Sequence, residues 1–391
     1  MKGSKLMRIT FEKDVLENAV NDSLCAVSDK NTYQTLECIR FRCENGDTVC
    51  SLTTYDLNKG FMSDIPCQVE EGGNYLINAA KLNRIIKFLP DRTVTLDINE
   101  KNIVKVISGR SKFELHALDG ETFPNTPELD GEKGFTVSAD ILKNMIGQVF
   151  FAIAVTDQRP VLCGAYFTVT DDSLKIVSCD GNRLAVREIK CELGNKNKDD
   201  SGLNLSFIVP GKTLSQLTRL VGEGEDQISV ILARKHVIFR LSDKVFFSRL
   251  IDGEYIDYHR VIPKDCTIFA EVDRLAYIAS LERASLVTED KSLGQVKSHV
   301  KFDFEGDILK VSSESLSGSV YDEVAITKEG DDLTIGFNCR YFLDALKSAD
   351  SEKIKISMKT PLMSVVITSA DSEKKENKSD YLYMVCPVRM N

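Results

Sequence analysis

The chain has 391 residues, of which 42% are hydrophobic and 28% charged, and its formal net charge is −9 at pH 7. These values are typical of a globular protein of two or three domains. No run approaches the roughly 20 apolar residues of a membrane span, and the first residues lack the apolar stretch of a signal peptide. Eleven scattered cysteines without a C-x-x-C pair, and only four histidines, argue against a zinc site and a disulfide framework. We therefore expect reduced thiols in a cytoplasm, with no cofactor and no metal.

Three passages of one pattern recur about 130 residues apart, which indicates internal repeats. Each passage joins an apolar strand end, a residue that suits a helix start, a helix and an alternating strand. The passages are Tyr75–Ile98, Phe207–Ile231 and Ile335–Ser357, and their helix-start residues are Asn78, Pro210 and Asn338. A second passage ahead of each places Phe41, Phe167 and Phe302 in register. The repeats predict three homologous domains, at residues 1–127, 128–263 and 264–391, with linkers at Pro124–Lys133 and Val261–Cys266.

Within each repeat the pattern predicts helix, strands, helix, strands. The predicted helices are Lys13–Val27, Ala79–Leu89, Ala139–Ile153, Gly211–Val221, Asp273–Val287 and Cys339–Ser348. Alternating runs between them predict strands, among them Arg40–Cys43, Leu174–Ser178, His236–Leu241 and Lys353–Met358. Two helices and many short strands per domain favour an α+β fold of antiparallel sheets with helices on one face.

The residue patterns of enzymes are absent from the sequence. Gly211–Thr213 has the tail of a phosphate-binding loop, but Ser206 stands where that loop needs its first glycine. No histidine has a nucleophile in a recognisable motif beside it. Paired acids such as Asp171–Asp172 fall in turns, where aspartate is favoured for backbone reasons. We predict a protein without catalytic residues.

Basic residues instead recur at one position of the second helix in each repeat. This position holds Lys87, Arg219 and Lys347, and Lys212 and Arg340 lie seven residues earlier in the second and third repeats. A spacing of seven returns to nearly the same side of a helix. Solvated helices normally carry some Lys or Arg, but the same sign in three repeats of an acidic chain favours a surface that neutralises phosphates without reading bases.

Five motifs, in order along the chain, carry a resemblance to a known family. They are Cys179–Val186 (CDGNRLAV), Ile208–Lys212 (IVPGK), Ser248–Pro263 (SRLIDGEYIDYHRVIP), Gly336–Leu346 (GFNCRYFLDAL) and Tyr383–Met390 (YMVCPVRM). Together they resemble the bacterial sliding clamp, the beta subunit of DNA polymerase III. The resemblance implies a ring of two head-to-tail protomers around duplex DNA, which tethers the polymerase and has no catalytic activity. A closed ring holds DNA by topology, so an acidic exterior is compatible with a few inward-facing cations.

The resemblance also implies a pocket for short linear motifs of polymerase subunits, the clamp loader and repair proteins. Carried over by matched position, its lining would be Leu162, Cys179, Gly181, Asn182, Arg183, Leu184, Ile256, Arg260, Val261, Leu362, Ser364, Met384, Cys386, Pro387, Val388 and Arg389, with Asn338 and Tyr341 at its margin. Apolar and sulfur-bearing walls suit a peptide anchored by Leu or Phe. The commoner family residues are replaced at Cys179, Asn182, Ile256 and Cys386, which leaves the preferred motif open.

For the homodimer, the resemblance places Lys112 and Phe113 of one protomer against Leu286 and Val287 of its partner. The acidic residues expected near this contact are reduced to Glu314, Asp322 and Glu323. The DNA-facing set implied for the helices is Arg84, Lys87, Lys212, Arg219, Arg340 and Lys347. Two alternative readings stay open at this point: an enzyme with an unrecognised site, and a repeat-built scaffold that binds proteins without encircling DNA.

Overall fold

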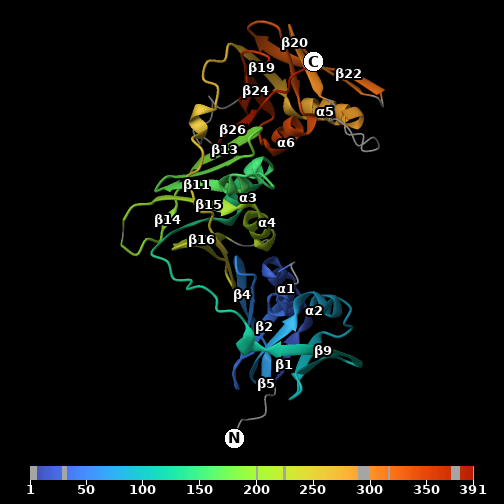
Figure 1. Ribbon diagram of the computed structural model, residues 1–391, viewed down its shortest axis with the longest axis vertical. Coiled ribbons are helices and arrows are strands. Elements are labelled where there is room, and N and C mark those ends of the chain that lie inside the picture. Colours follow the sequence, from blue (N-terminus) through green and yellow to red (C-terminus); the bar gives the residue numbers. More distant parts are fainter. Residues whose placement is uncertain are drawn as a thin grey trace. The chain divides into compact units, whose positions relative to one another are not determined.

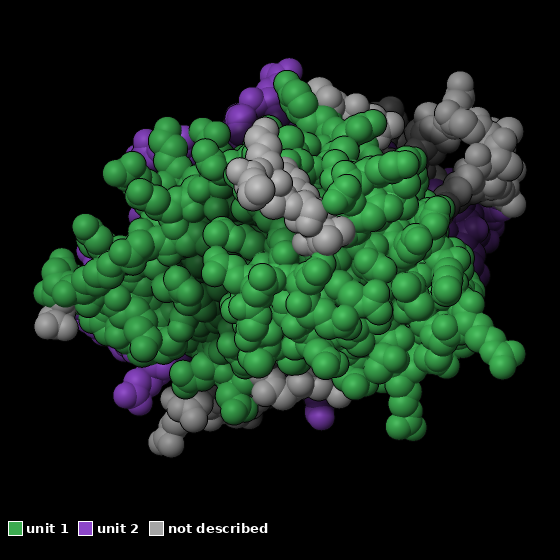
Figure 2. Space-filling view, turned by 90° about the horizontal axis from the view of Figure 1, so that it is seen from below, with its two compact units in different colours: residues 1–139, 194–201, 215–250 green, residues 140–193, 202–214, 251–391 purple. Residues whose placement is uncertain are grey.

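A computed structural model describes residues 7–28, 33–199, 201–222, 226–288, 299–315, 318–370 and 379–390. Contacts divide the chain into two compact units. The first contains residues 1–139, 194–201 and 215–250, and the second contains residues 140–193, 202–214 and 251–391. Figure 2 draws the first unit in green and the second in purple. Each unit is built on one large antiparallel sheet.

The first unit holds a 14-stranded sheet among the described residues. Its strands, in spatial order, are β14 (Gly194–Asn195), β10 (Lys133–Ser138), β16 (Gln227–Ala233), β17 (His236–Arg240), β18 (Lys244–Arg249), β4 (Lys59–Pro66), β3 (Val49–Tyr55), β2 (Cys38–Cys43), β6 (Gly73–Asn78), β9 (Ser111–Asp119), β8 (Ile103–Ser108), β7 (Thr93–Ile98), β1 (Met7–Glu12) and β5 (Gln68–Glu71). Strands of the first and second repeats meet where β18 pairs with β4. There Phe247 lies opposite Gly60, where a Cβ would come within 2.1 Å of the Phe247 ring, so only glycine fits.

Two helices cover one face of this sheet, α1 (Lys13–Ser23) and α2 (Ala79–Lys87), which lie side by side in Figure 1. Asn78 caps α2, because its side-chain oxygen accepts a hydrogen bond from the Lys81 amide at 3.0 Å. Leu82 and Ile86 of α2 are fully buried in the apolar core that α1 and the strands share. The spacing of four residues puts both side chains on the inward face and leaves the opposite face to solvent.

The second unit holds a 12-stranded sheet among the described residues. Its strands, in spatial order, are β15 (Asn204–Pro210), β11 (Gly164–Thr170), β12 (Ser173–Cys179), β13 (Arg183–Lys190), β26 (Ser379–Val385), β25 (Val365–Ser369), β24 (Lys353–Met358), β19 (Ile268–Asp273), β22 (Gly318–Glu329), β21 (Ile308–Ser315), β20 (Val300–Glu305) and β23 (Leu333–Phe337). The pairing of β13 with β26 joins the second repeat to the last strand of the chain.

The helices of the second unit are α3 (Ala139–Val149), α5 (Arg274–Thr288) and α6 (Cys339–Ser348). The division between the units falls within α4 (Gly211–Leu220), after residue 214. An aromatic core fixes α5 and α6 to the sheet, with Phe302 at its centre and its ring centroid 5.2 Å from that of Phe342. Phe302 is one of the three phenylalanines that the repeats place in register.

All six predicted helices are confirmed, and so are the four named strands. Four helices end earlier than predicted, α2 by two residues, α4 by one, and α1 and α3 by four each. α1 gives way to a 3₁₀ turn at Leu24–Ala26, and α3 to one at Phe150–Ala152, because the last helical turn tightens at an end without a glycine cap. The strands of the second repeat are divided between the sheets of the two units. The three domain boundaries come from the sequence repeats and stay a prediction. No helix in the described part is long and apolar enough to cross a membrane.

Candidate functional site

The turn between β12 and β13 carries the first group of predicted site residues. Asp180 organises it, because its carboxylate accepts hydrogen bonds from the amides of Asn182 and Arg183 at 2.9 and 3.0 Å. Gly181 between them has φ +89°, a backbone angle that favours glycine. The motif CDGNRLAV therefore specifies a tight turn that presents Gly181 and Asn182 to solvent.

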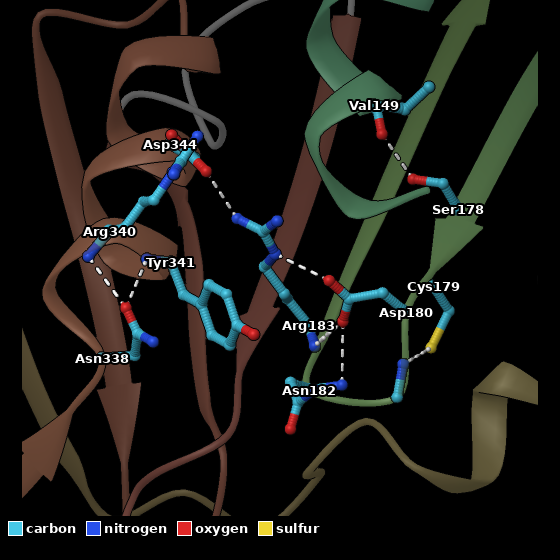
Figure 3. Close-up of polar contacts among 11 residues, drawn as sticks. Val149, Ser178, Cys179, Asp180, Asn182, Arg183, Asn338, Arg340, Tyr341 and Asp344 are labelled. Atoms are coloured by element: carbon cyan, nitrogen blue, oxygen red, sulfur yellow. Dashed lines mark hydrogen bonds and ion pairs between the residues drawn. The ribbon is translucent and has the colours of Figure 1, made fainter. Parts of the chain in front are cut away.

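Arg183 ties this turn to α6. Its Nε donates to Asp180 Oδ2 at 2.9 Å, and one terminal nitrogen donates to Asp344 Oδ2 at 2.7 Å (Figure 3). The guanidinium also lies over the Tyr341 ring at 4.3 Å and over the Phe151 ring at 5.4 Å. Only 11% of the side chain is exposed. The planar guanidinium can bind two carboxylates and stack at once, which lysine cannot do.

Other predicted residues lie beneath this turn in one apolar cluster. Leu162, Leu184, Cys179 and Met384 are all buried, with Met384 only 5% exposed. Ile256 and Cys386 are partly buried and pack against them. These six side chains form a floor of packed atoms, which gives the surface above it an apolar support.

Burial raises the pKa of the Cys179 thiol, although the Gly181 amide donates to its sulfur at 3.4 Å. The thiol is therefore protonated at neutral pH and behaves as a small apolar group, not as a nucleophile.

The remaining predicted residues are more exposed. Leu362 is 69% exposed and Val261 is 49% exposed, and both stand at the surface of the second unit. Gly181, Asn182, Arg260 and Arg389 are also exposed, and Ser364, Pro387, Val388, Asn338 and Tyr341 are half-buried. All eighteen predicted residues belong to the second unit.

The C-terminal tail is fixed beside the turn by backbone hydrogen bonds. The Cys386 amide donates to the Asn182 carbonyl at 2.8 Å, and the Val388 amide donates to the Gly336 carbonyl at 2.8 Å. The Ser364 hydroxyl lies 3.4 Å from the Cys386 sulfur. Asn338 caps α6 by accepting from the amides of Arg340 and Tyr341, as its position in the repeat predicted. These hydrogen bonds thus hold the C-terminal tail against the turn and against the segment that leads into α6.

Two groups of residues at this site were not predicted from the sequence. Asp344 and Phe151 hold Arg183 but were not predicted, and no local signal could reveal them, since Asp344 lies 161 residues away. A cavity of about 370 Å³ also opens on this unit, and none of the predicted residues lines it. Its lining is Lys175, Val186, Glu188, Tyr258, His259, Ile262, Thr368, Ser369, Tyr381 and Leu382. Val186, Tyr258 and Ile262 also belong to the apolar cluster beneath the turn, so the cavity adjoins the predicted site.

The six predicted DNA-facing residues are all exposed: Arg84, Lys87, Lys212, Arg219, Arg340 and Lys347. Lys347 pairs with Glu282 of α5 at 2.7 Å, with about half of each side chain exposed. None of the other five forms an ion pair with a described residue. An exposed pair contributes little, so the positive charge of Lys347 stays available to an anionic ligand.

The predicted dimer residues lie beside strand edges that have no partner in the described part of the chain. Residues 111–116 of β9 pair with β8 only, and residues 319–325 of β22 pair with β21 only. Phe113 on β9 is 40% exposed, and Leu286 on α5 is 81% exposed. Lys112 is exposed as well, and Val287 is half-buried.

The acidic residues near the β22 edge are engaged locally. Asp322 accepts from Arg283 Nε at 2.7 Å, and Glu323 accepts from the Tyr321 hydroxyl. Glu314 is exposed on β21. Their charge is therefore only partly available for contact with a basic surface. Among the described residues, no group of three or more His, Cys, Asp or Glu side chains could hold a metal ion.

Comparison with known proteins identifies the chain's relatives. Three family models match in succession: the N-terminal domain of the DNA polymerase III beta subunit over residues 7–127, the central domain over 136–257 and the C-terminal domain over 259–385. The beta sliding clamp of Bacillus subtilis (strain 168) is 28% identical over 98% of this chain and 100% of its own. That of Staphylococcus epidermidis (strain RP62A) is 30% identical over 94% of this chain and 97% of its own.

Solved structures agree with these matches. The sliding clamp of Bacillus subtilis superposes with a TM-score of 0.88 at 27% identity, covering 98% of this chain and all of that one. A sliding clamp from Pseudomonas aeruginosa, solved bound to griselimycin, superposes with a TM-score of 0.85 at 25% identity and the same coverage.

Three repeated α+β domains without a catalytic centre, matched over nearly the whole chain, define a processivity clamp of DNA replication. The chain belongs to the DNA polymerase III beta subunit family, the bacterial sliding clamps. Members of this family are non-catalytic homodimeric rings that encircle duplex DNA and tether the polymerase. The membership decides against the alternative of a protein-binding scaffold that does not encircle DNA.

Proposed function

We propose that this clamp contacts DNA through six exposed cations of α2, α4 and α6, namely Arg84, Lys87, Lys212, Arg219, Arg340 and Lys347, and binds partner peptides at the surface around Arg183. The observation that carries the DNA contact is the distribution of charge. The whole chain has 59 acidic and 50 basic residues, yet α2 and α4 contain no acidic residue at all. Cations without nearby acids attract phosphates at any base sequence, which suits a ring that must slide.

For the partner site, the support is the combination of an apolar floor with exposed apolar groups. Leu362 and Val261 are exposed. Val261 precedes Ile262, which packs against the buried cluster that includes Met384, and Leu362 lies two residues before Ser364, whose hydroxyl is 3.4 Å from the Cys386 sulfur. A short peptide with Leu or Phe anchors can cover such a surface and gain apolar contact. Arg183 holds the turn rigid, so the turn loses little conformational entropy when a peptide binds. The griselimycin-bound relative shows that a clamp of this family takes a ligand, and we extend this to polymerase subunits, the clamp loader and repair proteins.

For the dimer, we propose that the open edge of β9 meets the open edge of β22 of the partner copy, beside Phe113 and Leu286. Two unpaired edges expose amide and carbonyl groups that a second strand can satisfy. Contact of Phe113 with the partner's exposed apolar side chains would remove both from water. The three domains stay assigned to residues 1–127, 128–263 and 264–391.

For the location, we propose the cytoplasm. All eleven cysteines lie in the described part, and none of them is in a disulfide. Eleven cysteines without a disulfide fit a reducing compartment.

The DNA contact can be tested through its salt dependence. We expect a variant with Lys87, Lys212, Arg219 and Lys347 changed to Ala to bind duplex DNA with a smaller slope of log K against log salt, by about 0.9 for each phosphate that is no longer neutralised. The weakening should be equal on unrelated base sequences. Retention on circular DNA should change much less, because a closed ring stays linked without those cations.

Two controls complete the experiment. A variant with Lys101, Lys105 and Lys235 changed to Ala removes three exposed cations outside α2, α4 and α6 and should keep the parent's slope. Linear DNA should lose both proteins quickly, since a ring can run off an end. The proposal is refuted if the quadruple variant keeps the parent's salt slope, or if the parent leaves circular and linear DNA equally fast.

A further inference from the structure

An exposed aromatic side chain stands at the end of α2. Phe88 follows the last helical residue, and 86% of it is exposed, a larger fraction than for any other described phenylalanine. Its ring has no aromatic or cationic partner among the described residues. Its neighbour Leu89, by contrast, is buried in the core. The sequence thus places a large apolar ring in water at the end of a well-fixed helix, where a ligand can cover it.

The surroundings of Phe88 are cationic. Lys81, Arg84 and Lys87 of α2 are all exposed, and α2 contains no acidic residue. Lys81, Arg84 and Phe88 follow one another at helical spacings of three and four, which puts them along one face. Leu82 and Ile86 anchor the opposite face in the core, so the cations and the ring are presented on a rigid support.

The other two repeats show that the fold does not require an exposed ring here. Leu220 is the equivalent residue of the second repeat and is buried. Ser348 is that of the third, and its hydroxyl donates to the Asp344 carbonyl at 2.9 Å. The basic position recurs in all three repeats, but the exposed aromatic occurs in one. Phe88 therefore adds a property that the repeated cations do not supply.

We propose that Phe88, with Arg84 and Lys87, forms a contact for the unpaired bases of single-stranded DNA. This rests on the proposed function, in which α2 faces DNA. Duplex DNA offers phosphates and groove edges, while its base faces are stacked inside the helix. A ring flanked by cations finds a free base face only on a single strand, where stacking on an aromatic combines with attraction of the phosphates.

The test measures binding of the full-length protein to three labelled probes of equal length: an oligothymidine, the same backbone with abasic sites, and a duplex. Phe88→Ala should weaken oligothymidine binding about 5- to 150-fold, the range of one base stacked on an aromatic, and leave the affinity for the duplex unchanged. Its salt slope should stay that of the parent, because the charge of the protein is unchanged. Phe88→Tyr keeps a ring and should bind like the parent. The parent and Phe88→Ala should bind the abasic probe with equal affinity, because that probe has no base to stack on the ring.

Two further variants separate the possible failures. Lys87→Ala should weaken both single strand and duplex and reduce the salt slope; if it leaves the duplex slope unchanged, the proposed DNA contact of α2 fails, and this inference with it. Leu275→Ala removes another exposed apolar side chain, 65% exposed on α5, and should bind every probe like the parent. The inference alone is overturned if Phe88→Ala binds oligothymidine like the parent, if it weakens the duplex equally, or if sedimentation shows that it dissociates the dimer.

Discussion

Removing Arg183 should loosen the turn that carries the exposed part of the partner site. In Arg183→Ala the carboxylates of Asp180 and Asp344 lose the cation that binds them at 2.9 and 2.7 Å. Breaking a buried ion pair by removing one partner costs about 3–5 kcal/mol. Because 31% of the Asp344 side chain is exposed and water screens part of this cost, we expect about 2–3 kcal/mol.

Hydrogen exchange can measure this effect locally, which matters because a multidomain chain does not unfold in two states. The Cys386 amide donates to the Asn182 carbonyl at 2.8 Å, so its exchange reports opening of the turn. A destabilisation of 2–3 kcal/mol corresponds to about 30- to 150-fold faster exchange. Peptide affinity should fall in the same variant, since the turn must then be ordered on binding.

The controls use the geometry of the guanidinium. Arg183→Lys keeps the charge but cannot bind both carboxylates and stack on Tyr341, so its exchange should be intermediate. Asp344→Asn removes the negative charge of one acceptor. The destabilisation measured for the double variant, Arg183→Ala with Asp344→Asn, should be smaller than the sum of the two single effects. If Cys386 exchanges at the parent rate in Arg183→Ala, or if the two single effects simply add, Arg183 does not link the turn to α6.

Three further predictions concern other parts of the chain. Met384→Ala should lower the melting temperature, because truncating a buried side chain to Ala costs about 2–5 kcal/mol. Leu362 is exposed, so Leu362→Ala should keep the melting temperature and weaken peptide binding about 5- to 30-fold. Equal effects of the two variants on stability would contradict the assignment of Met384 to the buried floor and of Leu362 to the binding surface. Leu286→Ala should shift the dimer toward monomer in sedimentation equilibrium, while Leu275→Ala on the same helix should not. Burial lowers the pKa of His236, so the neutral form favours the fold; its contribution is present above the unfolded pKa of about 6.5 and is lost as the pH falls below it. The melting temperature of the parent should therefore decrease more between neutral pH and mildly acidic pH than that of His236→Gln, and parallel decreases would refute this.

The local elements of this chain could be predicted from the sequence because each depends on neighbouring residues. Helix caps such as Asn78 and Asn338 and the spacing of Leu82 and Ile86 determine where α2 and α6 begin and which face turns inward. The turn at Asp180 follows from a carboxylate placed two and three residues before the amides it binds. The number of domains could also be predicted, because the sequence pattern repeats three times and similar sequences adopt similar folds.

Only the tertiary structure decided which distant residues meet. It paired β13 with β26 and β18 with β4, so that strands of the second repeat complete two different sheets. It also placed Asp344 against Arg183 and buried Met384 while exposing Leu362. Sequence patterns of period two or 3.6 specify a face, but strand pairing across hundreds of residues depends on register and on the complementary shape of two sheets, which no local pattern contains.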